Sequence, residues 1–220
     1  MEFLAFDLEL IPYVVIVLAI AFTVHEFAHA YVAYKFGDPT AKNQGRLTLS
    51  PLAHLDPIGT LLIFIAGFGW AKPVPVNRFY FKNPRLAGVL VSVAGPLSNL
   101  VIAFIGLAVW YILLSTGALS SLSSGIAEGL HQFFNILIFL NITLFIFNLF
   151  PFPPLDGYRI IEDLAPSGIR AKMTQFESYG MVVFLILVLT PLDKYTIQPA
   201  FSYGTDIVMT VFESILNPFF

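Results

Sequence analysis

Residues 11–34 form a nearly uninterrupted apolar run, and three ionisable side chains lie in its second half. An α-helix needs about 20 apolar residues to cross a bilayer, so this run is long enough. A charged side chain at the centre of such a helix costs on the order of 2.5–3.5 kcal/mol by insertion scales and usually faces an internal cavity. His25, Glu26 and His29 therefore predict a functional site inside a bundle of membrane helices.

These three residues follow the pattern HExxH. His25 and His29 are four residues apart, so both imidazoles project from one face of a helix, as two ligands of one metal ion must. Glu26 falls beside the same site, which is the arrangement of zinc metallopeptidases. A polar cluster that only packs helices against each other is the alternative interpretation.

The composition is that of an integral membrane protein, because 57% of the 220 residues are hydrophobic and only 11% are charged. The chain has no cysteine, which excludes disulfides and thiolate metal ligands. A net charge of −3 gives no indication of a nucleic-acid partner. Acidic residues precede the first apolar run, where a removable signal peptide would be basic, so we expect no such signal.

The hydrophobic runs predict an all-α polytopic membrane protein with four to five transmembrane helices in a single domain over residues 1–220. The predicted spans are residues 11–34, 86–114, 130–150 and the shorter 179–192. Residues 201–220 fit either a fifth span or an interfacial helix.

A short insertion separates the first and second predicted spans. Residues 58–70 are apolar but too short to cross a bilayer, so we expect a re-entrant or interfacial element there. The flanking residues 45–49 and 72–77 fit short edge β-strands or extended loops. This insertion is expected to pack against the opening of the site.

Basic residues predict the orientation of the chain. Nearly all of them fall after the first and third spans, and only Lys194 lies elsewhere. By the positive-inside rule, that side is the cytoplasm, and the metal site lies toward it. The residues are Lys35, Lys42, Arg46, Lys72, Arg78, Lys82, Arg85, Arg159, Arg170 and Lys172.

A catalytic zinc ion normally takes three protein ligands, so a third ligand is needed. The candidates are His54, Asp56, His131 and Asp156. His131 falls at the outer end of the third span, far from the motif. Asp156 follows a group of prolines at the cytoplasmic end of that span, at a depth similar to that of His29. An ordinary turn is the alternative interpretation of this proline-rich segment.

At this point the chain resembles the site-2 protease family of intramembrane zinc metalloproteases, peptidase M50. The resemblance rests on HExxH in the first span and an Asn-x-x-Pro…Leu-Asp-Gly element that ends the third. It implies one Zn²⁺ per chain, held by His25, His29 and Asp156. It also implies that Glu26 is the catalytic base and that Asn148 helps to position the substrate.

Gly37 and the segments 50–60 and 94–99 resemble the minimal branch of this family, without PDZ or CBS domains. His54 is expected to line the site on the substrate side or to shuttle protons. A loop histidine that hydrogen-bonds to nearby backbone is the competing interpretation. The Gly-Pro pair and Asn99 of residues 94–99 are expected to kink and pack the helix rather than take part in catalysis.

The resemblance implies hydrolysis of peptide bonds within or near transmembrane segments of membrane proteins, with the lipid bilayer of a prokaryotic plasma membrane as the environment. A helical substrate must unwind, and the extended segments near Val74 and Val76 could hold it by strand addition. One rival is a protease that resembles the prenyl-protein proteases, which take a glutamate as third ligand. Another is an ion- or proton-coupled transporter, which would show inverted halves that this sequence lacks.

Overall fold

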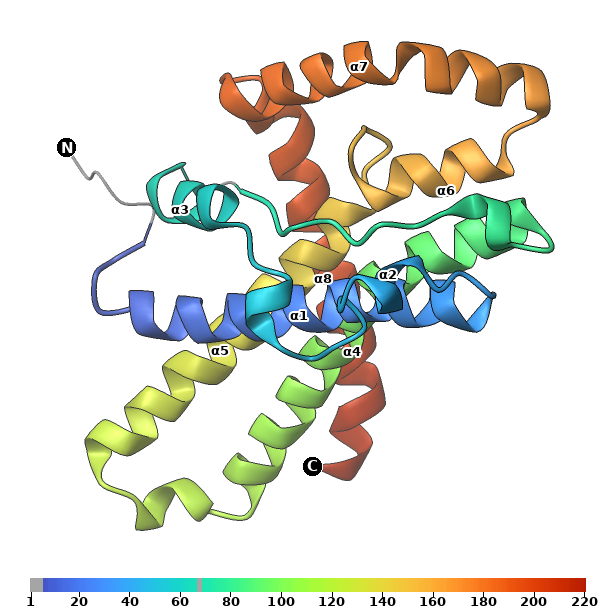
Figure 1. Cartoon of the computed structure of the whole chain (residues 1–220). Helices are drawn as coiled ribbons and strands as arrows, with labels where there is room; N and C mark the ends of the chain where they lie inside the picture. Colours follow the sequence, from blue (N-terminus) through green and yellow to red (C-terminus); the bar gives the residue numbers. More distant parts are fainter. Residues whose placement is uncertain (1–5, 67–68) are drawn as a thin grey trace.

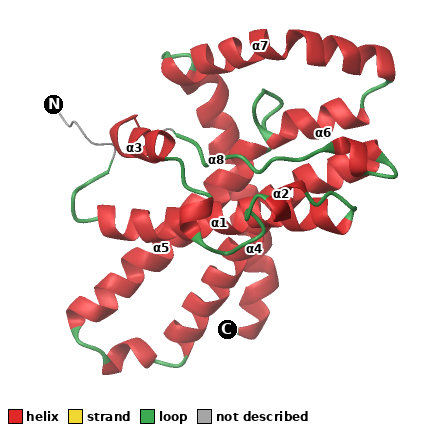
Figure 2. Ribbon diagram, in the orientation of Figure 1, coloured by secondary structure: helices red, strands yellow, loops and turns green. Residues whose placement is uncertain are grey.

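The computed structural model describes residues 6–66 and 69–220, and the regular structure in that part of the chain is helical (Figures 1 and 2). Four of the described helices are long and apolar enough to cross a bilayer. They are α1 (Ile11–Lys35), α4 (Pro84–Ser115), α5 (Ser124–Asn148) and α7 (Ser167–Leu189). The chain is therefore an integral membrane protein, and the all-α polytopic prediction is confirmed.

The helix boundaries differ from the predicted spans mainly in the second half of the chain. α1 and α4 agree closely with the predicted 11–34 and 86–114, whereas α5 begins earlier, at Ser124. α7 contains most of the predicted 179–192 but begins at Ser167, because its polar first half is also helical. α8 (Asp193–Leu216) covers most of residues 201–220 and is not among the four apolar candidates.

Three helices form the centre of the molecule. α1 packs against α4 and α5, and α4 also contacts α5 and α6 (Asp156–Leu164). Ala21, Ala30 and Ala33 of α1 are fully buried, and small residues at helix contacts let the backbones approach closely. This close approach brings the backbone of α4 next to the face of α1 that carries the HExxH motif.

The insertion between α1 and α4 contains four short helices, α2 (Thr40–Asn43), η1 (Pro51–Ala53), α3 (Pro57–Ala66) and η2 (Arg78–Tyr80). α3 is the predicted short apolar element, of which residues 67–68 lie outside the described residues. Of the two alternatives for the flanking segments, strands or extended loops, the described residues show the loops and contain only an isolated bridge between Leu55 and Ala71. Residues 72–77 are extended instead, since the prolines at 73 and 75 cannot donate to a ladder.

We call residues 71–77 the strap, and buried groups hold it in place. The N–H of Lys72 donates to the carbonyl of His54 at 2.8 Å, and Arg46 donates to the Lys72 carbonyl at 2.6 Å. The N–H of Asn77 donates to the Asp38 carboxylate at 2.6 Å. These bonds position the strap over α1, on the side that faces α6 (Figure 1).

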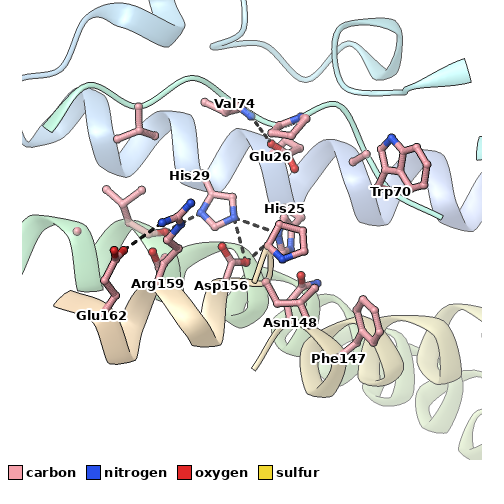
Figure 3. A pocket seen from close by; sticks show the side chains of 18 of the residues that line it. His25, Glu26, His29, Trp70, Val74, Phe147, Asn148, Asp156, Arg159 and Glu162 are labelled. Atoms are coloured by element: carbon pink, nitrogen blue, oxygen red, sulfur yellow. Dashed lines mark hydrogen bonds and ion pairs between the residues drawn. The ribbon is translucent and has the colours of Figure 1, made fainter. Parts of the chain in front are cut away.

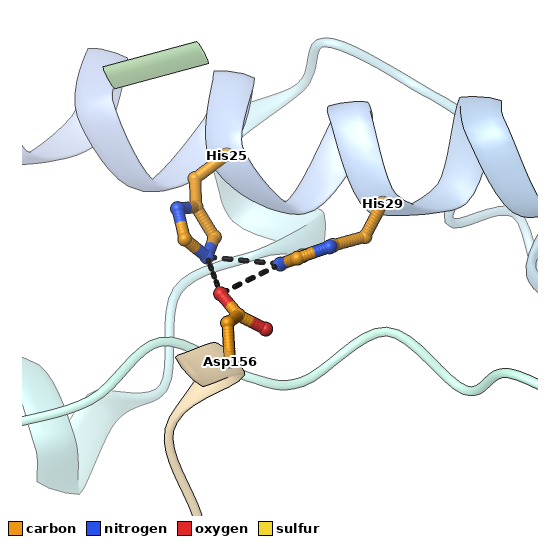
Figure 4. A group of neighbouring side chains, drawn as sticks. All are labelled: His25, His29 and Asp156. Carbon is orange, nitrogen blue, oxygen red and sulfur yellow. Dashed lines mark hydrogen bonds and ion pairs between the residues drawn. The ribbon is translucent and has the colours of Figure 1, made fainter. Parts of the chain in front are cut away.

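α6 begins immediately after the proline-rich segment that ends α5. Gly157 stands at its first turn, where a Cβ atom would clash with the carbonyl oxygen of Leu149. Only glycine therefore allows α6 to begin this close to the end of α5. The consequence is that Asp156, the first residue of α6, lies beneath α1 (Figure 4).

Candidate metal centre

Three potential metal ligands from two distant parts of the chain converge on one point (Figure 4). Asp156 Oδ2 lies 3.2 Å from His25 Nε2 and 3.3 Å from His29 Nε2. The two Nε2 atoms are 3.0 Å apart. Zinc–nitrogen bonds of about 2.0–2.1 Å in a tetrahedral site separate neighbouring ligands by about 3.3 Å, so these spacings fit one zinc ion.

The hydrogen bonds on the far side of each imidazole make the fit chemically specific. Nδ1 of His25 contacts the Asn99 side-chain oxygen at 2.7 Å, and Nδ1 of His29 contacts the Val91 carbonyl at 2.7 Å. Both oxygens are acceptors, so each Nδ1 carries the proton and each neutral ring turns a lone pair at Nε2 inward. Three electron-rich atoms that face one another require a cation between them.

Asp156 completes this set as an anion. Its Oδ2 atom is buried and has no hydrogen-bond partner, which is costly for a carboxylate without a cation. Two imidazoles and one carboxylate are the ligand classes that zinc accepts at catalytic sites.

Glu26 lies next to these ligands and is turned toward the strap. Its side chain is buried, and its Oε2 atom accepts a hydrogen bond from the N–H of Val74 at 2.8 Å (Figure 3). The strap therefore holds the carboxylate in a fixed orientation. A carboxylate that lines the same cavity as the ligands has the position needed to exchange a proton with water there.

A cavity of about 990 Å³ contains the ligands and Glu26 in its wall. Arg159 and Glu162 lie on one side of the ligands, and Trp70 and Phe147 lie on the other (Figure 3). Asn148, a predicted site residue, also lines this cavity and donates from Nδ2 to the Leu144 carbonyl at 2.9 Å. The wall is thus charged at one end and aromatic at the other.

The other three candidate ligands do not join this group within the described residues. His54 is fully buried in the loop after η1, and its Nε2 contacts the Thr48 carbonyl at 2.8 Å. Asp56 accepts from the N–H of Gly59 at 2.8 Å at the start of α3. His131 packs against Trp110, with ring centroids 5.5 Å apart, near the opposite end of α5 from Asn148. Of the described residues, only Asp156 joins the two histidines.

The contacts of Asn99 and Val91 with the imidazoles were missed in the sequence interpretation. Asn99 was assigned only to packing, yet its side-chain oxygen is the partner of His25. An asparagine inside an apolar span is itself a signal for a polar contact, since an unsatisfied amide there is costly. The Val91 carbonyl is a backbone group, and no residue type at position 91 indicates its role.

Comparison with known proteins identifies the chain. The model of peptidase family M50 matches residues 13–191. The chain belongs to peptidase family M50. This M50 protein is 59% identical to the candidate zinc metalloprotease YwhC of Bacillus subtilis over 217 residues, which cover 99% of the chain and 98% of YwhC. No solved structure gives a significant match.

More distant relatives in M50 are longer. The candidate zinc metalloprotease Rip2 of Mycobacterium tuberculosis is 34% identical over 179 residues, which cover 78% of this chain and 64% of Rip2. Rip2 of Mycolicibacterium smegmatis is 32% identical over 176 residues, which cover 76% of the chain and 62% of Rip2. The chain thus spans less than two thirds of the Rip2 proteins.

Membership of M50 and the four apolar helices make the chain an intramembrane zinc metalloprotease. Zinc is the metal that the family implies, and the convergent His25, His29 and Asp156 form a site that fits it. Membrane proteins are the substrate class that goes with the family. No finding favours the transporter alternative.

Proposed function

We propose that His25, His29 and Asp156 hold the zinc ion and that Glu26 is the general base in hydrolysis of membrane-protein substrates. The observation that carries the proposal is the inward convergence of three ligand atoms beside a buried glutamate in one cavity. Residues 1–220 would act as a single membrane-embedded metalloprotease domain, with the C-terminal α8 packed on α5.

The residues divide the chemistry between them. When bound, zinc lowers the pKa of water to about 7 and polarises a carbonyl group. Glu26 accepts the proton from the attacking water and passes it to the departing amine. The Val74 N–H keeps one oxygen of Glu26 fixed and leaves the other to exchange the proton. Asn148 contributes by positioning the substrate carbonyl from the wall of the cavity.

The shape of the cavity supports cleavage at the boundary between a transmembrane segment and its polar flank. Trp70 and Phe147 on one side suit apolar residues of the span, whereas Arg159 and Glu162 on the other suit polar residues that follow it (Figure 3). The peptide must be extended to expose its carbonyls. The strap is extended beside the cavity, and we propose that it holds the unwound peptide by strand addition.

We place the site on the cytoplasmic side of a prokaryotic plasma membrane. The support is the distribution of basic residues, which accumulate in the insertion after α1 and in the region of α6 and the start of α7. These are the segments that surround the cavity. The loop between α4 and α5, at the other end of those helices, contains no lysine or arginine.

Co-expression with a panel of tagged single-span membrane proteins tests the proposal. Cleavage by the unmodified chain is compared with cleavage by Glu26→Gln and Asp156→Ala, and zinc content is measured in each purified protein. Asp156→Ala is expected to lose both zinc and cleavage. Glu26→Gln is expected to keep zinc and lose cleavage, because the amide cannot accept the proton.

Two results would contradict these assignments. Cleavage retained by Glu26→Gln would exclude this residue as the base. Zinc retained at full occupancy by Asp156→Ala would exclude the aspartate as the third ligand, and His54 and Asp56 would then be tested in the same way.

A further inference from the structure

Two asparagines form a buried polar contact between α4 and α5, and nothing so far gives the second one a role. Asn99 and Asn141 both have 0% exposed surface. The neighbouring residues on α4 and α5 are mostly apolar. A buried primary amide in such surroundings is costly unless its hydrogen bonds are satisfied. Nδ2 of Asn99 donates to Oδ1 of Asn141 at 3.0 Å, so the two amides satisfy each other.

The direction of each amide in this pair follows from its neighbours. Nδ2 of Asn141 lies 2.8 Å from the carbonyl of Leu137, which can only accept, so Oδ1 of Asn141 must face Asn99. Asn99 must then turn its Nδ2 toward Asn141, where it is also 3.3 Å from the Ala21 carbonyl. The only group left to face the imidazole of His25 is Oδ1 of Asn99, at 2.7 Å.

An oxygen in that position fixes the tautomer of His25. It accepts from Nδ1–H, so the ring nitrogen that carries no proton is Nε2, which faces Asp156 and His29. We infer that Asn99 and Asn141 are positioning residues that hold His25 in its zinc-binding tautomer through two consecutive hydrogen bonds. This inference rests on the proposed zinc site. Loss of such an outer partner typically lowers metal affinity by about 10–100-fold.

We call Asn99 and Asn141 the relay, and it orients only His25 of the two histidines. His29 is held by the backbone carbonyl of Val91, which no side-chain substitution removes. His25 depends on a side chain of α4 that is itself oriented by a side chain of α5. The packing of α4 on α5 therefore affects zinc binding through His25, by way of Asn141, which is neither a proposed ligand nor one of the residues that line the cavity.

Zinc affinity of the purified full chain in detergent tests this inference, with a chromophoric chelator as competitor. Asn99→Leu is expected to bind zinc about 10–100-fold more weakly than the unmodified chain. Asn141→Leu is expected to bind zinc at least about threefold more weakly than the unmodified chain. Its loss of affinity is expected to be smaller than that of Asn99→Leu, because the Ala21 carbonyl still restrains Asn99. Asn99→Asp keeps an acceptor for Nδ1–H but loses the donor to Asn141, so it is expected to bind zinc more weakly than the unmodified chain and more tightly than Asn99→Leu.

Asn135→Leu is the matched control, since Asn135 is an exposed asparagine of the same helix as Asn141. Thermal melting of each metal-free variant separates a loss of affinity from a loss of folding. A merely structural role would give Asn99→Asp and Asn99→Leu the same loss of zinc affinity and would leave the zinc affinity of Asn141→Leu unchanged.

The outcomes also separate the inference from the proposed site. His25→Ala is measured in parallel. In one outcome, His25→Ala loses zinc affinity strongly while Asn99→Leu and Asn141→Leu keep a zinc affinity within about twofold of the unmodified chain. That result would overturn the relay and leave the proposed site standing. Unchanged zinc binding by His25→Ala would overturn the proposed site, and the relay with it. Equal loss in Asn135→Leu would also overturn the relay.

Discussion

A methyl group on Gly95 would lie 2.6 Å from Nε2 of His25. It would also overlap His29, so Gly95→Ala would fill the space next to both imidazoles. We expect Gly95→Ala to lose most of its bound zinc and most of its cleavage activity. The imidazole rings must turn away from the methyl group, so their Nε2 lone pairs no longer point at the proposed zinc position. Zinc content by elemental analysis measures the effect. Gly125→Ala, which meets nothing within 4 Å, is the control, and wild-type zinc in Gly95→Ala would contradict the geometry.

The N–H of Val74 is the group that holds Glu26, and proline can remove it without changing the local backbone much. Val74 stands between two prolines, which already restrict it to the extended region that proline itself adopts. A hydrogen bond to a charged group contributes about 1.5–3 kcal/mol, so Val74→Pro is expected to lower the cleavage rate about tenfold or more. Zinc content is expected to stay unchanged.

Val76→Pro separates this role from substrate binding. Val76 lies on the same strap, but the hydrogen bond to Glu26 comes from Val74, so the N–H of Val76 is not needed to hold Glu26 and could pair with a substrate strand. If the strap binds peptide by strand addition, Val76→Pro raises KM and leaves kcat nearly unchanged. If Val74→Pro and Val76→Pro both cleave like the unmodified chain, neither the restraint on Glu26 nor strand pairing is needed.

The contact between Gly88 and Asp163 links α4 to α6, the helix that begins with Asp156. Asp163 is 1% exposed and is paired with Arg78 and with Arg170, the latter at 3.1 Å. A Cβ atom at position 88 would lie 2.8 Å from the Asp163 carboxyl carbon. We expect Gly88→Ala to destabilise the fold by about 1–3 kcal/mol, as overpacking does, and to lower the melting temperature. An unchanged melting temperature would contradict the close packing of Gly88 against Asp163, because α6 would then have room for the added methyl group.

The absence of cysteine from the sequence allows a direct test of orientation. A single cysteine at Lys82, in the insertion, is expected to react with a membrane-impermeant maleimide only after the cells are opened. One at Ser120, in the loop between α4 and α5, is expected to react in intact cells. Retained cleavage by each variant confirms that the labelled protein is folded. The reverse labelling pattern would place the site on the outer side.

Much of the fold and of the proposed metal-ligand set follows from local sequence. The HExxH spacing defines one face of α1 by helical periodicity alone, and hydrophobic length locates α4 and α5. Asp156 is the exception among the proposed ligands. It was selected by its depth and by family resemblance, and the structure brings it within 3.3 Å of both imidazoles.

The rest depends on contacts between helices that sequence patterns do not contain. The hydrogen bond between Asn99 and His25 requires α4 to cross α1 with these two residues side by side. The hydrogen bond between Asn99 and Asn141 likewise requires α5 to pack on α4 with Asn141 beside Asn99. Alternation left open whether residues 72–77 form a strand or an extended loop, and the structure has the loop because the prolines of the strap cannot donate to a ladder. α7 was predicted too short because its first half is polar, and hydrophobic length detects only its apolar second half.

The ligands come from places far apart in the order of synthesis. Both imidazoles belong to α1, whereas Asp156 begins α6, which follows α4 and α5 in the chain. Until α4 and α5 have been synthesised, the nascent chain contains Glu26 and both histidines but lacks Asp156, the proposed third ligand. Hydrolysis that depends on the proposed site therefore cannot begin before α6 has joined the bundle.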